Sequence, residues 1–431
     1  MDYLESLSRL HDLTKFGINL GLERIKSLLQ QAGDPQDALS VIHIGGTNGK
    51  GSTAAMLTAV LKEAGYRVGT YTSPHLRSYT ERIMLNNQPI PEQDFADLLE
   101  EFLPLFEQVR VETGENPTEF EVLTAMAFLY FLRCQAEIVI LEVGLGGDID
   151  STNVIKKPVL SIITNVDIDH VNYLGKSLRE IAEKKSGIIK SHCPVITASC
   201  DDEVLHVLCR KAEQMEAPCL QVFREVFCQS LRETEDGQYF TAKTGHREWG
   251  ELYVPLQGEH QLVNAATAIL ALEVLISEGW EVTREHLVQG MKKVYWPGRL
   301  EVVRKSPLVV LDGAHNPAGM EFLSRWLERK KPGYSRVILV MGMLADKDRA
   351  QSVDYLAPYV DQVIITKPLS PRAGNWQELK QYFQNRQKNV IIIEKLAAAL
   401  QKAIQSAGSQ DMVLVTGSLY LIGEARDILT N

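Results

Sequence analysis

The 431 residues of the chain, 45% of them hydrophobic and 23% charged, give room for two or three domains of an ordinary soluble globular protein. The formal net charge of −10 and the lack of a basic run argue against a DNA or RNA partner, and no apolar stretch approaches the ~18 residues of a membrane span. Six scattered cysteines without a Cys-x-x-Cys pair support neither a zinc site nor a dense disulfide framework, and with no signal-peptide pattern they predict a cytoplasmic protein.

The first 40 residues have the spacing of helices. Their apolar stripe recurs at intervals typical of one helix face and consists of Leu20, Leu22, Ile25, Leu28 and Leu29. A β-branched run at residues 41–44 then leads into a glycine-rich loop, which predicts a strand that ends at a turn.

This loop, Gly45-Gly46-Thr47-Asn48-Gly49-Lys50-Gly51-Ser52-Thr53, carries a lysine and hydroxyls between the strand and a helical pattern that stops at Gly65. Loop N–H groups, a helix N-terminus and a lysine together favour an anion, and a hydroxyl can hold Mg²⁺. The spacing departs from the usual nucleotide loop by one missing residue before Gly49 and by an extra glycine after Lys50. Simple turn chemistry is the alternative, but the lysine and hydroxyls favour a nucleotide phosphate site.

Strand and helix patterns alternate after this loop. Strands are predicted at residues 67–72, 137–142 and 159–166, and helices at 92–109 and 118–133. Alternation of this kind predicts a parallel sheet with helices on both faces, which binds ligands at the carboxyl ends of its strands. Ser73, Glu142 and His170 follow or close three of these strands.

The pattern changes after Pro194. Short β-like pieces at 220–223, 238–242 and 251–254 predict a small antiparallel patch, and helices return at 262–278 and 284–293. A second βα series has strands at 308–311, 337–341, 362–366, 390–393 and 412–416. We therefore expect an α/β protein with one domain at residues 1–296 and a second, Rossmann-like domain at 297–431.

Three side chains at the strand ends form a candidate metal site. If their strands neighbour the phosphate loop, Ser73, Glu142 and His170 can hold a divalent metal against the phosphates. The alternative is that Glu142 is a solvated strand end and His170 a hydrogen-bonded loop residue. Lys185 lies on the inward stripe of a helical pattern, where an ammonium group needs an anion or altered chemistry. A snorkelling side chain is the other interpretation.

The second series contributes a polar turn at another strand end. Asp312-Gly313-Ala314-His315-Asn316-Pro317 follows the strand at 308–311, and Arg299 lies just before it. By itself this motif is typical of a turn. Together with Arg299 it can present an acid, an imidazole and a guanidinium to the phosphates of the first domain, which suits closure over a substrate.

These motifs, in this order, resemble the folylpolyglutamate synthase / dihydrofolate synthase family, a branch of the ATP-dependent ligases that includes the Mur enzymes. The resemblance spans nearly the whole chain, and the extra glycine at Gly51 is one of its marks. The matching stretches are residues 46–52, 72–76, 80–83, 142–147, 169–170, 183–188, 258–261 with 264–265, 296–301, 312–317 and 416–420.

The resemblance implies a Mur-type ATPase domain joined to a ligase domain, and a reaction in which ATP phosphorylates a folate-type carboxylate before the amine of L-glutamate attacks it. It implies that Lys50, Lys185 and His315 are catalytic. The implied ATP contacts are Asn48, Gly49, Lys50, Gly51, Ser52, Thr53, Asn264, Arg299, Asp312 and His315. The implied metal ligands are Ser73, Glu142, His170 and Lys185, the last as a carbamate. The implied folate contacts are His75, Arg82, Thr118, Phe120, Glu121, Asp150 and Asn153.

Two Mg²⁺ ions, a carbamylated lysine and ATP as cosubstrate are expected from the resemblance, with K⁺ as a candidate further ion. The expected partners are L-glutamate and either dihydropteroate or tetrahydrofolate polyglutamates, on a monomer. One residue departs from the family, which commonly has arginine where this chain has Asp148. Two other functions stay open: a Mur-type ligase acting on a peptidoglycan nucleotide, and a P-loop nucleotide-binding protein without ligase activity.

Overall fold

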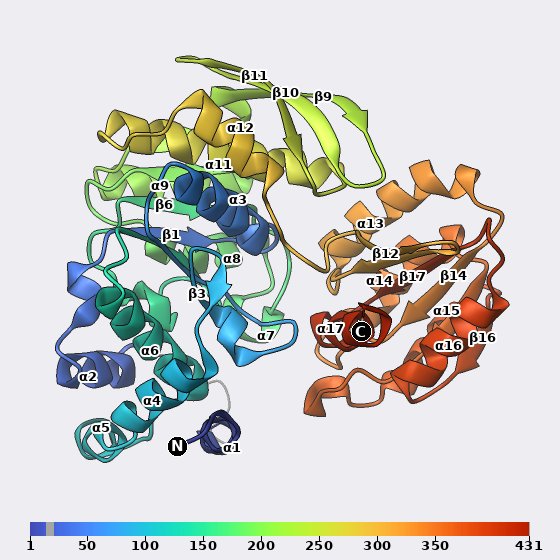
Figure 1. Cartoon of the computed structure of the whole chain (residues 1–431), viewed down its shortest axis with the longest axis horizontal. Helices are drawn as coiled ribbons and strands as arrows, with labels where there is room; N and C mark the ends of the chain where they lie inside the picture. Colours follow the sequence, from blue (N-terminus) through green and yellow to red (C-terminus); the bar gives the residue numbers. More distant parts are fainter. Residues whose placement is uncertain (14–20, 431) are drawn as a thin grey trace.

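The computed structural model describes residues 1–13 and 21–430, so Leu20 of the predicted stripe lies outside the described residues. Three sheets organise the chain. In Figure 1 the N-terminal part, with an eight-stranded and a three-stranded sheet, lies beside a C-terminal part built on a six-stranded sheet. The predicted α/β class is confirmed. The domain boundary near residue 297 stays a prediction.

The largest sheet has the strand order β4-β3-β2-β5-β1-β6-β7-β8. Strands β2, β5, β1, β6, β7 and β8 pair in parallel, and β3 and β4 add an antiparallel edge. Their bounds are β1 (Val41–Gly45), β2 (Val68–Tyr71), β3 (Ile83–Leu85), β4 (Gln88–Pro89), β5 (Ile138–Glu142), β6 (Leu160–Ile163), β7 (Val195–Thr197) and β8 (Cys219–Gln221). The central strands are buried along their whole length, as expected when both faces are covered.

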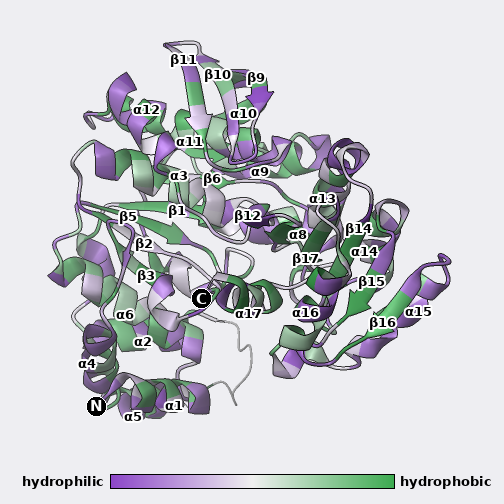
Figure 2. Cartoon of the chain, turned by 45° about the vertical axis from the view of Figure 1, so that its right-hand side comes forward, coloured by the Kyte–Doolittle hydropathy of each residue, from purple (hydrophilic) through white to green (hydrophobic). Residues whose placement is uncertain are grey.

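Helices cover both faces of this sheet. On one face, α3 (Lys50–Glu63), α11 (Glu259–Ser277) and α12 (Arg284–Lys292) share a core with Ile42 and Ile44, and on the other Val41 joins a separate core. The second face is covered by α1 (Tyr3–Leu13), α2 (Glu23–Gln31), α4 (Glu92–Phe102), α5 (Leu105–Thr113) and α6 (Glu119–Arg133). Near the carboxyl edge lie α7 (Val171–Leu174), α8 (Leu178–Lys185) and α9 (Asp202–Gln214). Figure 2 shows the strands mostly green and the outward helix faces purple.

One of the two helices predicted between residues 92 and 133 needs correction. The single helix expected at 92–109 is two helices, because Pro104 cannot continue the hydrogen-bonded turn of α4 and becomes the N-cap of α5. The helix expected at 118–133 is confirmed as α6, with Thr118 and Glu121 forming a capping box.

The small antiparallel patch is confirmed but begins later than predicted. It consists of β9 (Val226–Glu233), β10 (Gln238–Thr244) and β11 (Glu248–Val254). The prediction that residues 220–223 belong to this patch is wrong. Strand β8 pairs in parallel with β7 in the large sheet, and α10 (Val222–Glu225) follows it.

Within residues 1–13 and 21–430, one helix meets the length and hydropathy expected of a membrane span, although the sequence-based prediction found no such stretch. This is α11, with 19 residues and a mean hydropathy of 1.4, of which 72% is buried inside the molecule. It packs against α3 and against strands of both N-terminal sheets. Burial of this extent is typical of a core helix.

The second βα series forms a six-stranded sheet in the order β12-β13-β17-β14-β15-β16. Its strands are β12 (Glu301–Lys305), β13 (Leu308–Asp312), β14 (Val337–Met341), β15 (Gln362–Ile365), β16 (Asn389–Ile392) and β17 (Met412–Thr416). The unpredicted β12 is antiparallel to β13, and the other pairs are parallel. The helices are α13 (Pro317–Lys330), α14 (Arg349–Leu356), α15 (Leu379–Gln384), α16 (Leu396–Ser406) and α17 (Leu419–Thr430).

Candidate active site

One cavity of about 960 Å³ is lined by residues from both parts of the chain. Its walls come from the segments after β1, β2, β5, β6 and β7 of the large sheet, and after β13, β14 and β17 of the six-stranded sheet. The predicted site residues that line it are Asn48, Gly49, Lys50, Gly51, Ser52, Ser73, Thr118, Phe120, Glu142, Asp150, His170, Lys185, Asn264, Arg299, Asp312 and His315. Residues more than 250 positions apart in the sequence therefore meet in one site.

The phosphate loop between β1 and α3 is held from behind by the segment after β6. The backbone N–H of Thr47 donates to the Asn165 carbonyl at 2.8 Å, and that of Asn48 donates to the Asn165 side chain at 2.7 Å. Gly49 has a φ of 87° at the N-cap of α3, a conformation that glycine adopts without strain. A Cβ on Gly51 would lie 2.4 Å from the Trp296 ring. The extra glycine therefore admits Trp296 beside the first turn of α3.

Two lysines meet at this loop. The Lys50 ammonium donates to the carbonyls of Gly46 and Thr47, both at 3.2 Å, and lies 3.9 Å from the Glu142 carboxylate. The Lys185 ammonium donates to the same Gly46 carbonyl at 2.8 Å and is only 4% exposed. Burial, together with the charge of Lys50, lowers the pKa of Lys185 to about 7. The prediction that Lys185 points inward is confirmed.

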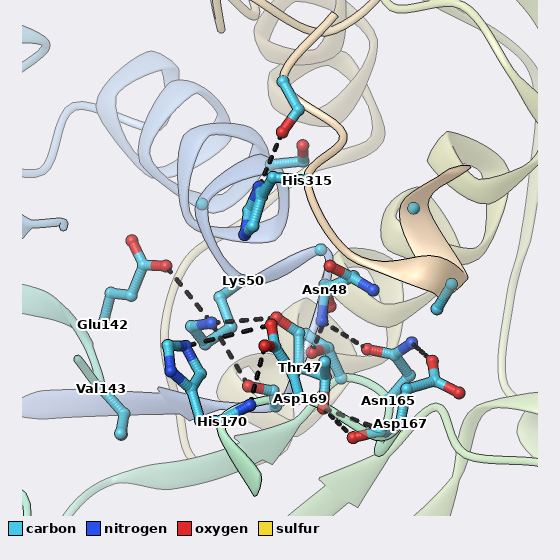
Figure 3. A pocket seen from close by; sticks show the side chains of 18 of the residues that line it. Thr47, Asn48, Lys50, Glu142, Val143, Asn165, Asp167, Asp169, His170 and His315 are labelled. Carbon is cyan, nitrogen blue, oxygen red and sulfur yellow. Dashed lines mark hydrogen bonds and ion pairs between the residues drawn. The ribbon is translucent and has the colours of Figure 1, made fainter. Parts of the chain in front are cut away.

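The three candidate metal ligands and both lysines line the cavity, and Figure 3 shows Glu142, His170 and Lys50 among the lining side chains. Glu142 ends β5 and accepts the Ser73 backbone N–H at 3.2 Å; burial raises its pKa, against the effect of Lys50. Burial lowers the pKa of His170 to about 4, so its imidazole is neutral near pH 7 and can act as a ligand. A carboxylate and a hydroxyl suit Mg²⁺. Within residues 1–13 and 21–430, however, no three His, Cys, Asp or Glu side chains are already grouped as a metal site.

The C-terminal part supplies the opposite wall. The Asp312 carboxylate accepts the backbone N–H groups of Leu300 at 3.0 Å and Ala314 at 2.9 Å, which fixes the turn at the end of β13. His315 Nδ1 lies 2.8 Å from the Gly313 carbonyl. Because a carbonyl only accepts, Nδ1 carries the proton and Nε2 is an acceptor. Burial lowers the pKa of His315 to about 4, so the ring is neutral near pH 7.

Four polar side chains clasp the two parts together over the phosphate loop. The Asn316 amide donates to Asn48 at 3.2 Å and to the Asp169 carboxylate at 2.9 Å, and the Lys347 ammonium lies 2.6 Å from Asp169. Burial opposes ionisation of Asp169, but the Lys347 ammonium outweighs it and holds the pKa of this carboxyl below its usual range.

Five predicted site residues do not line the cavity. Thr53 is buried in α3, and Asn153 donates to the carbonyls of Asp148 and Gly187. Glu121 caps α6 and pairs with Arg24. His75 Nδ1 accepts from Arg82 Nε at 2.9 Å, and both rest on the Tyr79 ring behind the wall.

Several lining residues were missed by sequence reasoning. Asp169 stood inside a recognised motif without a stated role, as did Asn316, which donates to Asp169 but does not itself line the cavity. Lys347 and Ser418 follow β14 and β17, so the rule that ligands bind at carboxyl ends could have found them. The Ser418 hydroxyl is buried and has no hydrogen-bond partner within the described part of the chain. Asp148, which stands where the family commonly has arginine, forms an ion pair with Lys184, whose ammonium lies 3.1 Å from the Asp148 carboxylate.

Comparison with known proteins identifies the family. A model described as the Mur ligase middle domain matches residues 44–272, and one described as the Mur ligase glutamate ligase domain matches residues 298–419. The chain is 37% identical over 426 residues to the dihydrofolate synthase/folylpolyglutamate synthase of Bacillus subtilis, covering 98% of each protein. This chain belongs to the Mur ligase family, in its folylpolyglutamate synthase/dihydrofolate synthase branch.

Solved structures of this family have the same fold. Mycobacterium tuberculosis folylpolyglutamate synthase complexed with ADP has a TM-score of 0.91 at 31% identity, over 100% of this chain and 99% of that one. Escherichia coli FolC in complex with DHPP and ADP has a TM-score of 0.87 at 31% identity, over 99% and 97% of the two chains. The chain is accordingly an ATP-dependent ligase.

Proposed function

We propose that this protein adds L-glutamate to a folate-type carboxylate in an ATP-dependent reaction. The observation that carries the proposal is the meeting of the phosphate loop, the buried Lys185 and the wall containing His315 in one cavity. The acceptor carboxylate is phosphorylated by ATP, the amine of glutamate attacks the acyl phosphate, and phosphate leaves. Lys50 and the loop N–H groups hold the phosphates, since phosphoryl transfer depends on positioning and charge neutralisation.

We assign a separate region of the cavity to each of the three substrates. Asn48, Lys50 and Asn264 lie on the ATP side, together with Arg299 and Asp312 from the other part. Thr118 and Phe120 form the acceptor wall, because an aromatic ring beside a capped helix start suits a flat pterin. Lys347, Arg372 and Ser418 line the remaining wall, where cations and a hydroxyl suit the carboxylates of glutamate.

Ser73, Glu142 and His170 would hold one Mg²⁺, which when bound neutralises charge on the phosphates. With its pKa near 7, Lys185 has an unprotonated fraction at neutral pH, and an amine must be unprotonated to combine with CO₂. The resulting carbamate would make Lys185 an anionic ligand for a second Mg²⁺, and K⁺ is a candidate further ion. We further propose that the protein is a cytoplasmic monomer with domains at residues 1–296 and 297–431.

The test is release of phosphate from ATP with dihydropteroate or a tetrahydrofolate as acceptor, with and without L-glutamate, followed by mass analysis of the product. We expect glutamate-dependent turnover and a product larger by one glutamate residue. No turnover with either acceptor would refute the proposal. Activity on a UDP-linked peptidoglycan precursor would favour the Mur-type alternative, and nucleotide binding without turnover would favour the P-loop binding protein.

A further inference from the structure

A histidine lies in the middle of the strand that carries the phosphate loop. His43 is fully buried in β1, opposite Leu141 of β5 and Ser161 of β6. Burial lowers its pKa to about 3, so the imidazole is neutral at physiological pH. His43 does not line the cavity, and neither the phosphate site nor the metal site uses it.

The hydrogen bonds around His43 define its tautomer. Its Nε2 lies 2.8 Å from the Thr152 hydroxyl, and that hydroxyl donates its one proton to the Asp150 carboxylate. The Thr152 oxygen can therefore only accept from the imidazole, so Nε2 carries the proton and Nδ1 does not. The chain of donors runs in one direction, from His43 through Thr152 to Asp150.

This series of hydrogen bonds ends at the proposed acceptor wall. Asp150 lines the cavity, and its other carboxylate oxygen accepts the Leu145 backbone N–H at 2.8 Å. The Asp150 carboxylate thereby ties both ends of the 145–152 turn together, and Gly144 beside it packs so closely on Phe120 that a Cβ would lie 2.5 Å from the ring. A shift of Asp150 would consequently displace the wall on which Phe120 rests.

Simple packing does not account for a histidine at this position. His43 Nδ1 is buried and has no hydrogen-bond partner within residues 1–13 and 21–430. A buried acceptor without a partner lowers stability, whereas an isoleucine or valine would fill a central strand without that loss. The specific contribution of the imidazole is the proton that Nε2 donates.

We infer that His43 is a positioning residue for the acceptor wall: by donating to the Thr152 hydroxyl it fixes that hydroxyl as a donor to Asp150 and holds the 145–152 turn in place. The inference rests on the proposed function only in naming a folate-type molecule as the ligand of this wall. The hydrogen-bond chain itself is a property of the protein without substrate, so it can be tested separately.

The first experiment measures the histidine tautomer in the substrate-free protein. Nitrogen-15 NMR of the imidazoles, with His43→Gln used to assign the signal, should show a neutral ring protonated at Nε2 from about pH 5 to pH 8. Thr152→Val should shift this signal because it removes the acceptor. A ring protonated at Nδ1 would overturn the inference, whatever reaction the enzyme catalyses.

The second experiment compares His43→Leu, which removes the donor, with His43→Gln, whose amide keeps one. In His43→Leu we expect the KM for the folate-type acceptor to rise about tenfold, as for one lost buried hydrogen bond, with the KM for ATP nearly unchanged. His43→Gln should recover most of this loss. Ile42→Val, a neighbouring core change without a hydrogen bond, is the matched control and should leave both KM values unchanged.

Double variants distinguish an effect that acts through the His43–Thr152 hydrogen bond from a nonspecific disturbance of the structure. His43→Leu should add nothing to the effect of Thr152→Val, because both break the same link. Equal rises in the KM for ATP and for the acceptor, or a His43→Gln variant as impaired as His43→Leu, would overturn the inference. If His43→Leu does not fold, Thr152→Val and Thr152→Ser give the same comparison, since serine keeps the hydroxyl and valine does not.

Discussion

At the scale of single residues, the site depends on two ammonium groups that share one acceptor. Lys50 and Lys185 both donate to the Gly46 carbonyl, and only Lys185 is deeply buried. A buried ammonium close to another ammonium loses its proton more easily. The Gly46 carbonyl of the phosphate loop therefore accepts both from the lysine that we propose holds the phosphates and from the lysine that we propose reacts with CO₂.

Activity should depend on CO₂ in a way that follows the pKa of Lys185, which is lowered to about 7. The unprotonated fraction of the amine rises as the pH rises through 7, so turnover in bicarbonate should exceed that in CO₂-free buffer, and more so above pH 7 than below it. Lys185→Ala should abolish this response and reduce turnover by about 100-fold or more. Lys184→Ala is the control; an unchanged rate in CO₂-free buffer would contradict the carbamate.

Lys50→Ala should remove ATP-dependent stabilisation of the fold. The alanine variant lacks the cation at the phosphate loop, so kcat/KM for ATP should fall by about 100-fold or more, and ATP should no longer raise the melting temperature. Lys62→Ala, an exposed lysine at the other end of α3, is the matched control. A full thermal shift with ATP in Lys50→Ala would place the phosphates elsewhere.

At the scale of elements, α17 joins the two parts of the molecule. A Cβ on Gly423 of this helix would lie 2.1 Å from the Leu76 carbonyl oxygen, and the Leu76 side chain packs on the core beneath α17. Leu76 belongs to the loop after β2, whose Ser73 and Pro74 line the cavity. Glycine inside a helix costs about 1 kcal/mol relative to alanine, and here it permits this close approach.

Gly423→Ala should destabilise the protein although alanine favours helices. Forcing a methyl group against the Leu76 backbone costs about 1–3 kcal/mol, which urea unfolding followed by fluorescence should measure as a lower free energy of unfolding. Gly245→Ala, where a Cβ meets nothing within 4 Å, serves as the control and should be nearly neutral. A stabilised Gly423→Ala variant would show that helix propensity outweighs the contact.

At the scale of the whole molecule, the clasp formed by Asn48, Asn316, Asp169 and Lys347 holds the parts closed over the phosphate loop. The side chains of Lys347 and Asp169 are 6% and 10% exposed. Removing one partner of such a pair leaves an uncompensated buried charge, which is destabilising by several kcal/mol. Opening the two parts would hydrate that charge.

Lys347→Met should therefore open the molecule. We expect a larger radius of gyration in small-angle X-ray scattering and a higher KM for ATP, because Asp169 is left without its ammonium partner. Lys331→Met, which breaks the exposed pair with Asp361 inside the C-terminal part, should change neither, as exposed pairs contribute ~0–1 kcal/mol. A radius identical to that of the unmodified protein would contradict the role of the clasp.

Sequence periodicity predicted most of the fold because buried parallel strands are continuous apolar runs, as in β5 and β14. It failed where the pairing of a strand depends on neighbouring strands that are distant in the sequence. Strand β8 pairs with β7 rather than with the antiparallel patch, and β12 is a half-exposed edge strand with little pattern of its own. Both depend on partners that a local window does not contain.

The sequence by itself determined the phosphate loop, the position of Glu142 at the end of β5, and the inward direction of Lys185, because each follows from local spacing and chemistry. His170 was predicted to close a strand, but β6 ends at Ile163 and His170 is the N-cap of α7. Only the tertiary structure decided what these residues face. Long-range packing gives Lys185 and Lys50 a common carbonyl, brings Lys347 to Asp169, and links the buried His43 to Asp150 through Thr152. These contacts join residues far apart in the sequence, and the Lys347–Asp169 pair also requires the N-terminal and C-terminal parts to lie together.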